Sequence, residues 1–277
     1  MITFYQFGNS VCCQKARITM SEKGLGWEPI EVNLFRNEQY LPEYLKINPK
    51  AVVPAMIHDG KTIIESTLIC EYLDDVFPTP LLIPKDPYLR AQMRLWSKMV
   101  DEGLHEGISE ISFSAMFRQR LKNSTPEERE VRFRNIGDPR RRDRFKSTYE
   151  LGTQSPFVLY AVAAYYKAFN SMEEGLAGQG PWLLGEELSL ADINMMPYVA
   201  RLHYLGLLDV WIADKPAAKA WWQRTQQLPS FVAGLVAPMK TQELEEMAKH
   251  GPTIRGELAE LYGQVAAAQA QFHPAGA

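Results

Sequence analysis

Turn-forming residues divide the first 78 residues into short alternating segments, and no other feature of the sequence constrains the fold as strongly. Gly, Pro and Asp-Gly turns separate apolar runs typical of strands from stretches typical of helices. The predicted elements are strands at residues 2–7, 27–34, 52–58 and 61–64, helices at residues 12–23 and 68–76, and a helix-compatible polar segment at residues 37–46. The order β-α-β-α-β-β-α predicts an α/β domain with a mixed four-stranded sheet.

The rest of the chain is predicted to be helical. Four prolines between residues 77 and 87 give this stretch the composition of a linker. Apolar residues recur at helical spacing from residue 88 to about residue 121, and Ser189 and Asp192 have the spacing of a helix capping box. We expect an α/β domain at residues 1–80, a linker at 81–87, an all-helical domain at 88–250 and a C-terminal extension at 251–277.

Composition and charge argue against several classes of protein. The 277 residues are 46% hydrophobic and 23% charged, which is ordinary for a globular protein with a sizeable core. The net charge of −3 gives no overall attraction to nucleic acid or to an anionic membrane. The chain starts with a strand-like run, and no run approaches about 18 apolar residues. We therefore expect a cytoplasmic protein that has neither nucleic acid nor a membrane as a partner.

The cysteines and histidines predict neither a disulfide framework nor a metal site. Cys12 and Cys13 are adjacent, and Cys70 lies far along the chain. None of the five histidines pairs with a cysteine or another histidine at a spacing typical of metal ligands.

Many arginines occur between residues 123 and 149, where apolar residues are few. We interpret this Arg-rich segment as a solvated insertion, because aromatic residues are not interleaved with its charges. A basic binding face is the alternative.

Ser10 is in the predicted turn between the first strand and the first helix. A residue at such a turn lies beside unpaired backbone N–H groups and the positive end of the helix dipole, which stabilise a thiolate or another anion. A hydroxyl there can donate a hydrogen bond to a thiolate, whereas a cysteine there can itself ionise and attack. The candidate catalytic residues are therefore Ser10, Cys12 and Cys13.

Two further motifs of the first domain are suited to binding a peptide-like ligand. Val53-Pro54 begins an edge-type strand, where a cis peptide bond would leave the backbone groups of Val53 free to pair with an extended ligand. Glu65 and Ser66 open a helix, where Glu65 can hold an ammonium group and Ser66 a carboxylate.

The order and spacing of these motifs resemble the soluble glutathione transferases, whose first domain has a thioredoxin fold. The resemblance covers roughly residues 1–247. It rests on Ser10-Val11-Cys12-Cys13-Gln14-Lys15-Ala16-Arg17, on Asn48-Pro49 before Val53-Pro54, on Glu65-Ser66, on Glu71-Tyr72-Leu73 and on Ser189-x-Ala191-Asp192. This resemblance implies a thioredoxin-like domain followed by an all-α domain, glutathione as the cofactor, and a homodimer.

The resemblance also implies roles for individual residues. Ser10 aligns with the residue that activates the glutathione thiol in serine-type classes and with the active cysteine in cysteine-type classes. The implied glutathione-binding residues are Asn9, Gln39, Val53, Pro54, Glu65, Ser66 and Asp101. Among them, Gln39 matches a position that often contacts the glycyl carboxylate, and Asp101 one that reaches the neighbouring subunit's glutathione in some relatives.

We expect a hydrophobic electrophile to bind between the first turn and the long helices. The candidate residues form an apolar lining that is suited to an aromatic substrate. They are Phe7, Met99, Gly103, Phe113 and Met116, together with Ile111 and Phe117. Packing between helices is the alternative role for each of them.

The predicted function is transfer of glutathione to an aromatic electrophile, in detoxification or in the catabolism of aromatic compounds. Parts of the sequence are similar to bacterial β-etherases, which are glutathione transferases that displace an aryloxide from lignin-derived aryl ethers. Two alternatives stay open. One is a glutathione lyase or reductase that uses Cys12 or Cys13, and the other is a non-enzymatic interaction module with the same fold.

Overall fold

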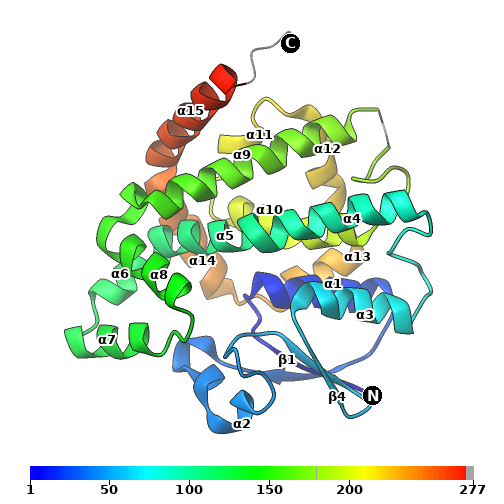
Figure 1. The fold of residues 1–277 in the computed structure, drawn as a ribbon, viewed down its shortest axis with the longest axis horizontal. Helices are drawn as coiled ribbons and strands as arrows, with labels where there is room; N and C mark the ends of the chain where they lie inside the picture. Colours follow the sequence, from blue (N-terminus) through cyan, green and yellow to red (C-terminus); the bar gives the residue numbers. More distant parts are fainter. Residues whose placement is uncertain (179, 273–277) are drawn as a thin grey trace. The chain divides into compact units, whose positions relative to one another are not determined.

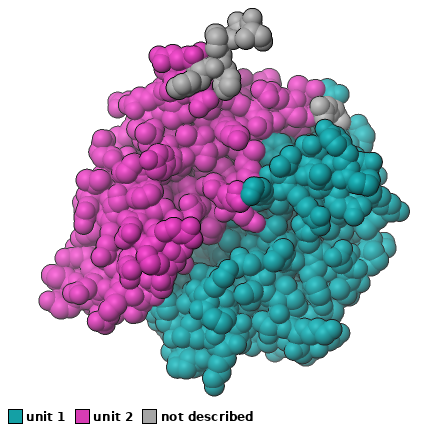
Figure 2. Space-filling model, in the orientation of Figure 1, with its two compact units in different colours: residues 1–98, 178–198, 220–243 teal, residues 99–177, 199–219, 244–277 magenta. Residues whose placement is uncertain are grey.

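The computed structural model describes residues 1–178 and 180–272, and it divides into two compact units (Figures 1 and 2). Unit 1 comprises residues 1–98, 178–198 and 220–243, and unit 2 comprises residues 99–177, 199–219 and 244–277. Each unit thus combines segments that are distant in the sequence. The boundary expected at residues 81–87 stays a prediction, and residues 273–277 of the expected C-terminal extension lie outside the described residues.

A mixed four-stranded sheet with the order β2-β1-β3-β4 lies in unit 1. The strands are β1 (Ile2–Gln6), β2 (Glu28–Glu31), β3 (Ala55–His58) and β4 (Lys61–Ile64). Strand β1 is parallel to β2 and antiparallel to β3, and β3 is antiparallel to β4. Phe4 lies opposite Met56 in the β1–β3 pair, and both side chains are fully buried. The predicted element order and the mixed sheet are confirmed. The edge-type strand expected after Val53-Pro54 is wrong, because β3 lies between β1 and β4 and pairs with both.

Helices α1 (Val11–Glu22) and α3 (Ser66–Val76) pack side by side over the sheet (Figure 1). The Nζ atom of Lys15 on α1 donates a hydrogen bond to Oγ1 of Thr67 on α3, at 2.8 Å. At the other end of α1, Lys23 forms an ion pair of 2.6 Å with Asp74 of α3. Both contacts are buried, so the two helices form a rigid support for the turns that precede them.

The helix-compatible segment at residues 37–46 does not form one helix, and this expectation is corrected. The structure has short turns there, namely η1 (Leu34–Arg36), η2 (Glu38–Tyr40) and α2 (Pro42–Leu45). Asn37 adopts a left-handed conformation with φ of 60°, which ends the first turn. Leu41 is extended because it precedes Pro42, whose ring disfavours a helical conformation at the preceding residue.

The remaining elements are helical, which confirms the predicted all-α region. They are α4 (Pro87–Met99), η3 (Val100–Leu104), α5 (His105–Ser112), η4 (Phe113–Phe117), α6 (Arg118–Lys122), α7 (Pro126–Arg134), α8 (Pro139–Leu151), η5 (Gly152–Gln154), α9 (Pro156–Leu176), α10 (Leu190–Tyr204), α11 (Asp209–Ile212), α12 (Pro216–Thr225), α13 (Pro229–Phe231), η6 (Val232–Val236), α14 (Thr241–His250), η7 (Gly251–Ile254) and α15 (Arg255–Phe272). Among the described residues, no helix combines the length and the apolar character needed to cross a membrane.

Asp192 fixes the start of α10 within unit 1. Its carboxylate accepts hydrogen bonds from the backbone nitrogen of Ser189 at 3.2 Å and from the Ser189 hydroxyl at 3.1 Å. It also accepts from the backbone nitrogen of Leu183 and from Nε1 of Trp221, each at 2.9 Å. Burial raises the pKa of Asp192, and these donors act in the opposite direction. The predicted capping role of Ser189 and Asp192 is confirmed.

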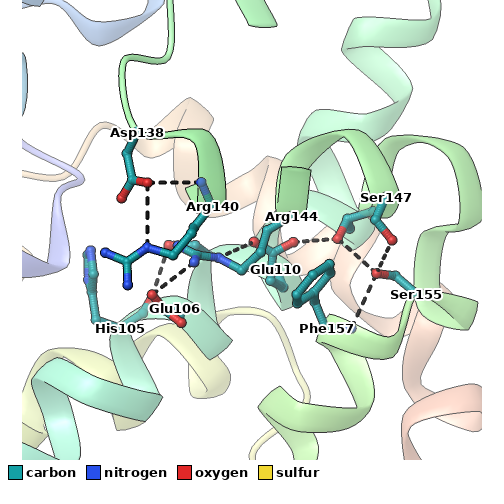
Figure 3. Close-up of polar contacts among 11 residues, drawn as sticks. His105, Glu106, Glu110, Asp138, Arg140, Arg144, Ser147, Ser155 and Phe157 are labelled. Atoms are coloured by element: carbon teal, nitrogen blue, oxygen red, sulfur yellow. Dashed lines mark hydrogen bonds and ion pairs between the residues drawn. The ribbon is translucent and has the colours of Figure 1, made fainter. Parts of the chain in front are cut away.

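The Arg-rich segment folds as α7 and α8 within unit 2, over a small apolar cluster that includes Phe113, Phe133 and Ile136. Figure 3 shows Arg144 of α8 between two carboxylates of α5. Its Nη1 atom lies 3.0 Å from Glu106, and its Nε atom lies 3.7 Å from Glu110. Burial raises the pKa of Glu110, while a hydrogen bond from a hydroxyl of α8 and the charge of Arg144 oppose that rise. Part of the segment therefore has a structural role and is not simply solvated.

Candidate functional site

Ser10 lies in the turn between β1 and α1 and is the N-cap residue of α1. Its backbone nitrogen donates to the carbonyl of Phe7 at 3.0 Å, and its carbonyl accepts from the nitrogen of Gln14 at 2.9 Å. Its Oγ atom accepts from the backbone nitrogen of Cys13 at 3.4 Å. The Ser10 hydroxyl is half-buried, and it lies at the end of α1 where the helix dipole is positive.

Cys13 is fully buried in the first turn of α1. Burial raises the pKa of the Cys13 thiol to about 11 and outweighs the charge of Arg17 and a hydrogen bond with Ser10, which both lower it. A cysteine nucleophile reacts as the thiolate, which this environment disfavours at neutral pH. The geometry therefore favours Ser10 over Cys13 as the group that meets a ligand.

Cys12 is half-buried, and its Sγ atom lies 3.8 Å from the hydroxyl of Tyr198 on α10. Tyr198 itself is fully buried, and its ring also lies 5.9 Å from Nζ of Lys15. Tyr198 is not among the residues predicted from the sequence. Its contact with Cys12 spans 186 residues, so no local pattern could indicate it.

The register of the sheet brings the three predicted motifs to one end of unit 1. Tyr5, near the end of β1, lies opposite Ala55, the first residue of β3. Ala55 also lies opposite Ile64, the last residue of β4. Because β1 leads to Ser10, β3 follows Pro54 and β4 leads to Glu65, all three motifs lie at the same sheet end.

Two of these motifs have unusual backbone geometry. The Val53–Pro54 peptide bond is cis, and both residues are buried. Glu65 has φ of 70° and ψ of 113°, a conformation that residues with a Cβ rarely adopt. A backbone conformation like that of Glu65 is typical of functional sites. Ser66 follows as the first residue of α3 and is 8% exposed.

Polar groups of three other residues contribute to the predicted binding region. Lys50 forms an ion pair of 2.6 Å with Glu65. The side chain of Gln39 is buried, and its Oε1 atom has no hydrogen-bond partner among the described residues. Asn9, directly before Ser10, is also buried. The binding roles of Asn9 and Gln39 stay predictions.

The residues predicted to line the electrophile site are divided between the units. Phe7 belongs to unit 1, is buried, and contacts Phe35 edge to face at 5.3 Å. Phe113 belongs to unit 2 and stacks on Phe145 at 5.4 Å, within the apolar cluster beneath α7 and α8. Phe113 therefore packs between helices, which was the alternative role. Its part in substrate binding stays a prediction.

The other predicted residues of the second region also lie in unit 2. Met116 is buried and Met99 is half-buried. A Cβ atom at Gly103 would lie 3.4 Å from Cβ of Ala164, so Gly103 allows a close approach to α9. Asp101 is exposed. The predicted ligand contacts of these residues remain untested.

Comparison with known proteins identifies the family. The model of the glutathione S-transferase N-terminal domain matches residues 4–81, and that of the C-terminal domain matches residues 127–224. The chain also resembles the crystal structure of the β-etherase LigF from Sphingobium sp. strain SYK-6, with a TM-score of 0.76 and 30% identity. That match covers 85% of this chain and 99% of the LigF chain. The protein belongs to the glutathione S-transferase family and is a glutathione transferase enzyme.

Two curated relatives are similar over shorter stretches. The protein LigF from Sphingobium sp. strain SYK-6 is 48% identical over 103 residues, which is 36% of this chain and 40% of LigF. Maleylacetoacetate isomerase from Mus musculus is 28% identical over 199 residues, which is 71% of this chain and 76% of the isomerase. The higher identity to LigF thus extends over less than half the length of that relative.

Proposed function

We propose that this glutathione transferase uses Ser10 to activate the glutathione thiol for attack on a hydrophobic aromatic electrophile. The observation that carries the proposal is the sheet register, because it brings Ser10, Pro54 and Glu65 to one end of the sheet. A tripeptide ligand laid along that end meets the Ser10 hydroxyl, the backbone of Val53 just before β3 and the Glu65 carboxylate in turn. The fully buried Cys13, with its raised pKa, further supports Ser10 as the activating group.

Glutathione binds in this proposal through its backbone and its charged γ-glutamyl end. The backbone of Val53 pairs with the cysteinyl unit of glutathione. Glu65 holds the γ-glutamyl ammonium, and Ser66 with the first N–H groups of α3 holds the γ-glutamyl carboxylate. Gln39 reaches the glycyl carboxylate. These contacts fix the cysteinyl sulfur beside Ser10.

Ser10 activates bound glutathione by lowering the pKa of its thiol. The thiol releases its proton to solvent, and the Ser10 hydroxyl donates a hydrogen bond to the resulting thiolate. The positive end of α1 stabilises the same negative charge. The thiolate forms a carbon–sulfur bond with the electrophile, and in a substitution the leaving group departs with the electron pair of the broken bond. Binding both reactants together supplies the rest of the rate gain.

We further propose that the electrophile is an aryl ether, which would be cleaved with departure of an aryloxide. This proposal rests on the likeness to the β-etherase LigF. A panel of β-aryl ethers, aryl halides and mixed disulfides, each assayed with glutathione, tests it. Release of a phenol from the aryl ether is the expected result. Activity confined to aryl halides would contradict the ether assignment but not the transferase mechanism.

A second candidate function is cysteine-dependent lysis or reduction of a glutathione conjugate. The half-buried state of Cys12 favours it, because Cys13 is fully buried. Preferential turnover of mixed disulfides, lost in Cys12→Ser and retained in Ser10→Ala, would establish this function. Retention of the folded protein on immobilised glutathione tests both enzymatic proposals against a non-enzymatic module.

We propose that the protein acts as a cytoplasmic homodimer. Large apolar side chains are exposed on α3 and α4, with Leu68 and Leu95 each 57% exposed and Tyr88 69% exposed. Such apolar side chains are typical of a surface that a second subunit covers. Among the described residues the three cysteines form no disulfide, which fits a reducing compartment.

A further inference from the structure

Arg17 is a charged side chain that is only 1% exposed. Its Nε atom donates to the carbonyl of Gly234 in η6 at 2.7 Å, and its Nη2 atom donates to the carbonyl of Gly8 at 2.7 Å. Its Nη1 atom donates to Oε1 of Gln6 at 3.0 Å. Burial of a guanidinium is unfavourable unless its donors are satisfied, and here they bind three separate acceptors.

Both glycines that accept from Arg17 lie where no larger residue fits. A Cβ atom at Gly8 would lie 2.5 Å from the carbonyl oxygen of Pro238. A Cβ atom at Gly234 would lie 2.6 Å from the backbone nitrogen of Ile18. The backbone before Ser10 and the backbone of η6 are therefore pressed against neighbouring main chain, and Arg17 bridges the two.

We infer that Arg17 is a positioning residue that holds the Gly8-Asn9-Ser10 turn in register with α1 and η6. The inference rests on the proposed function, in which Ser10 activates the glutathione thiol. Gly8 precedes Ser10 by two residues, so its carbonyl fixes the path of the turn. A planar guanidinium can bind both carbonyls at once, whereas an ammonium is a single point of charge. A shift of about 1 Å in a reacting group can reduce the rate on the order of 100-fold.

The charge of Arg17 also acts on a thiol in the first turn of α1. It lowers the pKa of Cys13 against the larger effect of burial. Burial lowers the pKa of Arg17, whereas the charges of Cys13 in α1 and Glu31 in β2 act to raise it. The guanidinium thus supplies positive potential in the first turn of α1 in addition to its hydrogen bonds.

Three variants of graded severity test the inference. Arg17→Met removes the positive charge and the hydrogen bonds to the carbonyls of Gly8 and Gly234. Arg17→Lys keeps a positive charge but lacks the planar guanidinium that binds both carbonyls. Gln6→Ala removes one acceptor and is expected to fold, because Gln6 is half-buried. Ser230→Ala is the matched control, since the Ser230 hydroxyl binds the Glu22 carboxylate and joins α13 to α1 without contacting the turn. For each variant we would measure thermal unfolding, kcat, the KM for glutathione and the pH dependence of kcat with an activated aryl halide.

The expected result is a loss of kcat that follows the loss of the bridge. Arg17→Lys should reduce kcat roughly 10- to 100-fold and move the pH profile toward higher pH, while the KM for glutathione changes little. Gln6→Ala should give a smaller change in the same direction, and Ser230→Ala should keep the wild-type profile. An unchanged kcat and pH profile in every Arg17 or Gln6 variant that folds would overturn the inference. A wild-type protein that transfers glutathione to no electrophile would instead refute the proposed function.

Discussion

The Nζ atom of Lys50 lies 2.6 Å from a carboxylate oxygen of Glu65, the residue whose φ of 70° opens α3. The two side chains are 62% and 46% exposed, and ion pairs in such surroundings contribute little to stability. The pair instead shows that the Glu65 carboxylate can be reached by a cation. In the proposed complex, the γ-glutamyl ammonium of glutathione exchanges with Lys50 at this carboxylate.

Glu65→Gln is expected to raise the KM for glutathione roughly tenfold, because the amide keeps the shape of the side chain but loses the charge that attracts the ammonium. Steady-state kinetics with varied glutathione would measure the change. Asp59→Asn is the matched control, since Asp59 is an exposed carboxylate that pairs with the N-terminal ammonium at 2.9 Å. An unchanged KM in Glu65→Gln would contradict the proposed binding role.

Cys13 is expected to make the folded protein less stable in alkaline solution. The thiol pKa is raised from 9.0 to about 11 by burial, so between these values the folded state keeps a proton that the unfolded state has released. The free energy of unfolding should therefore fall as the pH rises from 9 to 11. Urea unfolding at several pH values should show a steeper fall for the wild type than for Cys13→Ala. Equal slopes would show that the Cys13 thiol is not shifted in this way.

Asp192→Ala is expected to lower the free energy of unfolding by roughly 3 kcal/mol. The substitution leaves the buried donors of Leu183, Ser189 and Trp221 without their acceptor. Asp214→Ala serves as the comparison, because its carboxylate is 76% exposed and should matter by less than about 0.5 kcal/mol. Urea denaturation measures both, and similar values for the two variants would contradict the structural role of Asp192.

Leu95→Glu is expected to convert the proposed dimer to a monomer. A charge in the centre of an apolar interface is left without a partner when the second subunit covers it. Light scattering at matched concentration would measure the molar mass. Val131→Glu changes an apolar residue of α7 that is 44% exposed, and this variant should remain dimeric. A monomeric wild type would refute the dimer proposal.

Local turn chemistry explains why the element order of the first 78 residues could be predicted. Gly24 has φ of 61° just after α1, and the Asp59-Gly60 turn joins β3 to β4 with positive φ at both residues. These conformations are encoded by neighbouring residues alone. The division of residues 37–46 into short turns could not be predicted in the same way. The polar composition of this segment is compatible with a helix, and the extended Leu41 before Pro42 interrupts it.

The motifs of the candidate site could be predicted from the sequence, but the buried residues that hold those motifs in place could not. Ser10, Pro54 and Glu65 have local signals, and the strand order then brings them to one sheet end. The sequence around Arg17 indicates only a charged residue on a helix. Its burial depends on the carbonyl of Gly234, 217 residues away, and no local pattern encodes that contact.

Titration of the glutathione thiol bound to the wild type, to Ser10→Ala and to Cys12→Ser tests directly whether Ser10 activates that thiol. The ultraviolet absorbance of the thiolate reports its pKa, and kcat with an aryl electrophile is measured in parallel. We expect Ser10→Ala to lose the thiolate near neutral pH and to lose kcat roughly 100-fold, whereas Cys12→Ser should keep both. A Ser10→Ala variant with the wild-type thiol pKa and kcat would show that Ser10 does not activate the thiol.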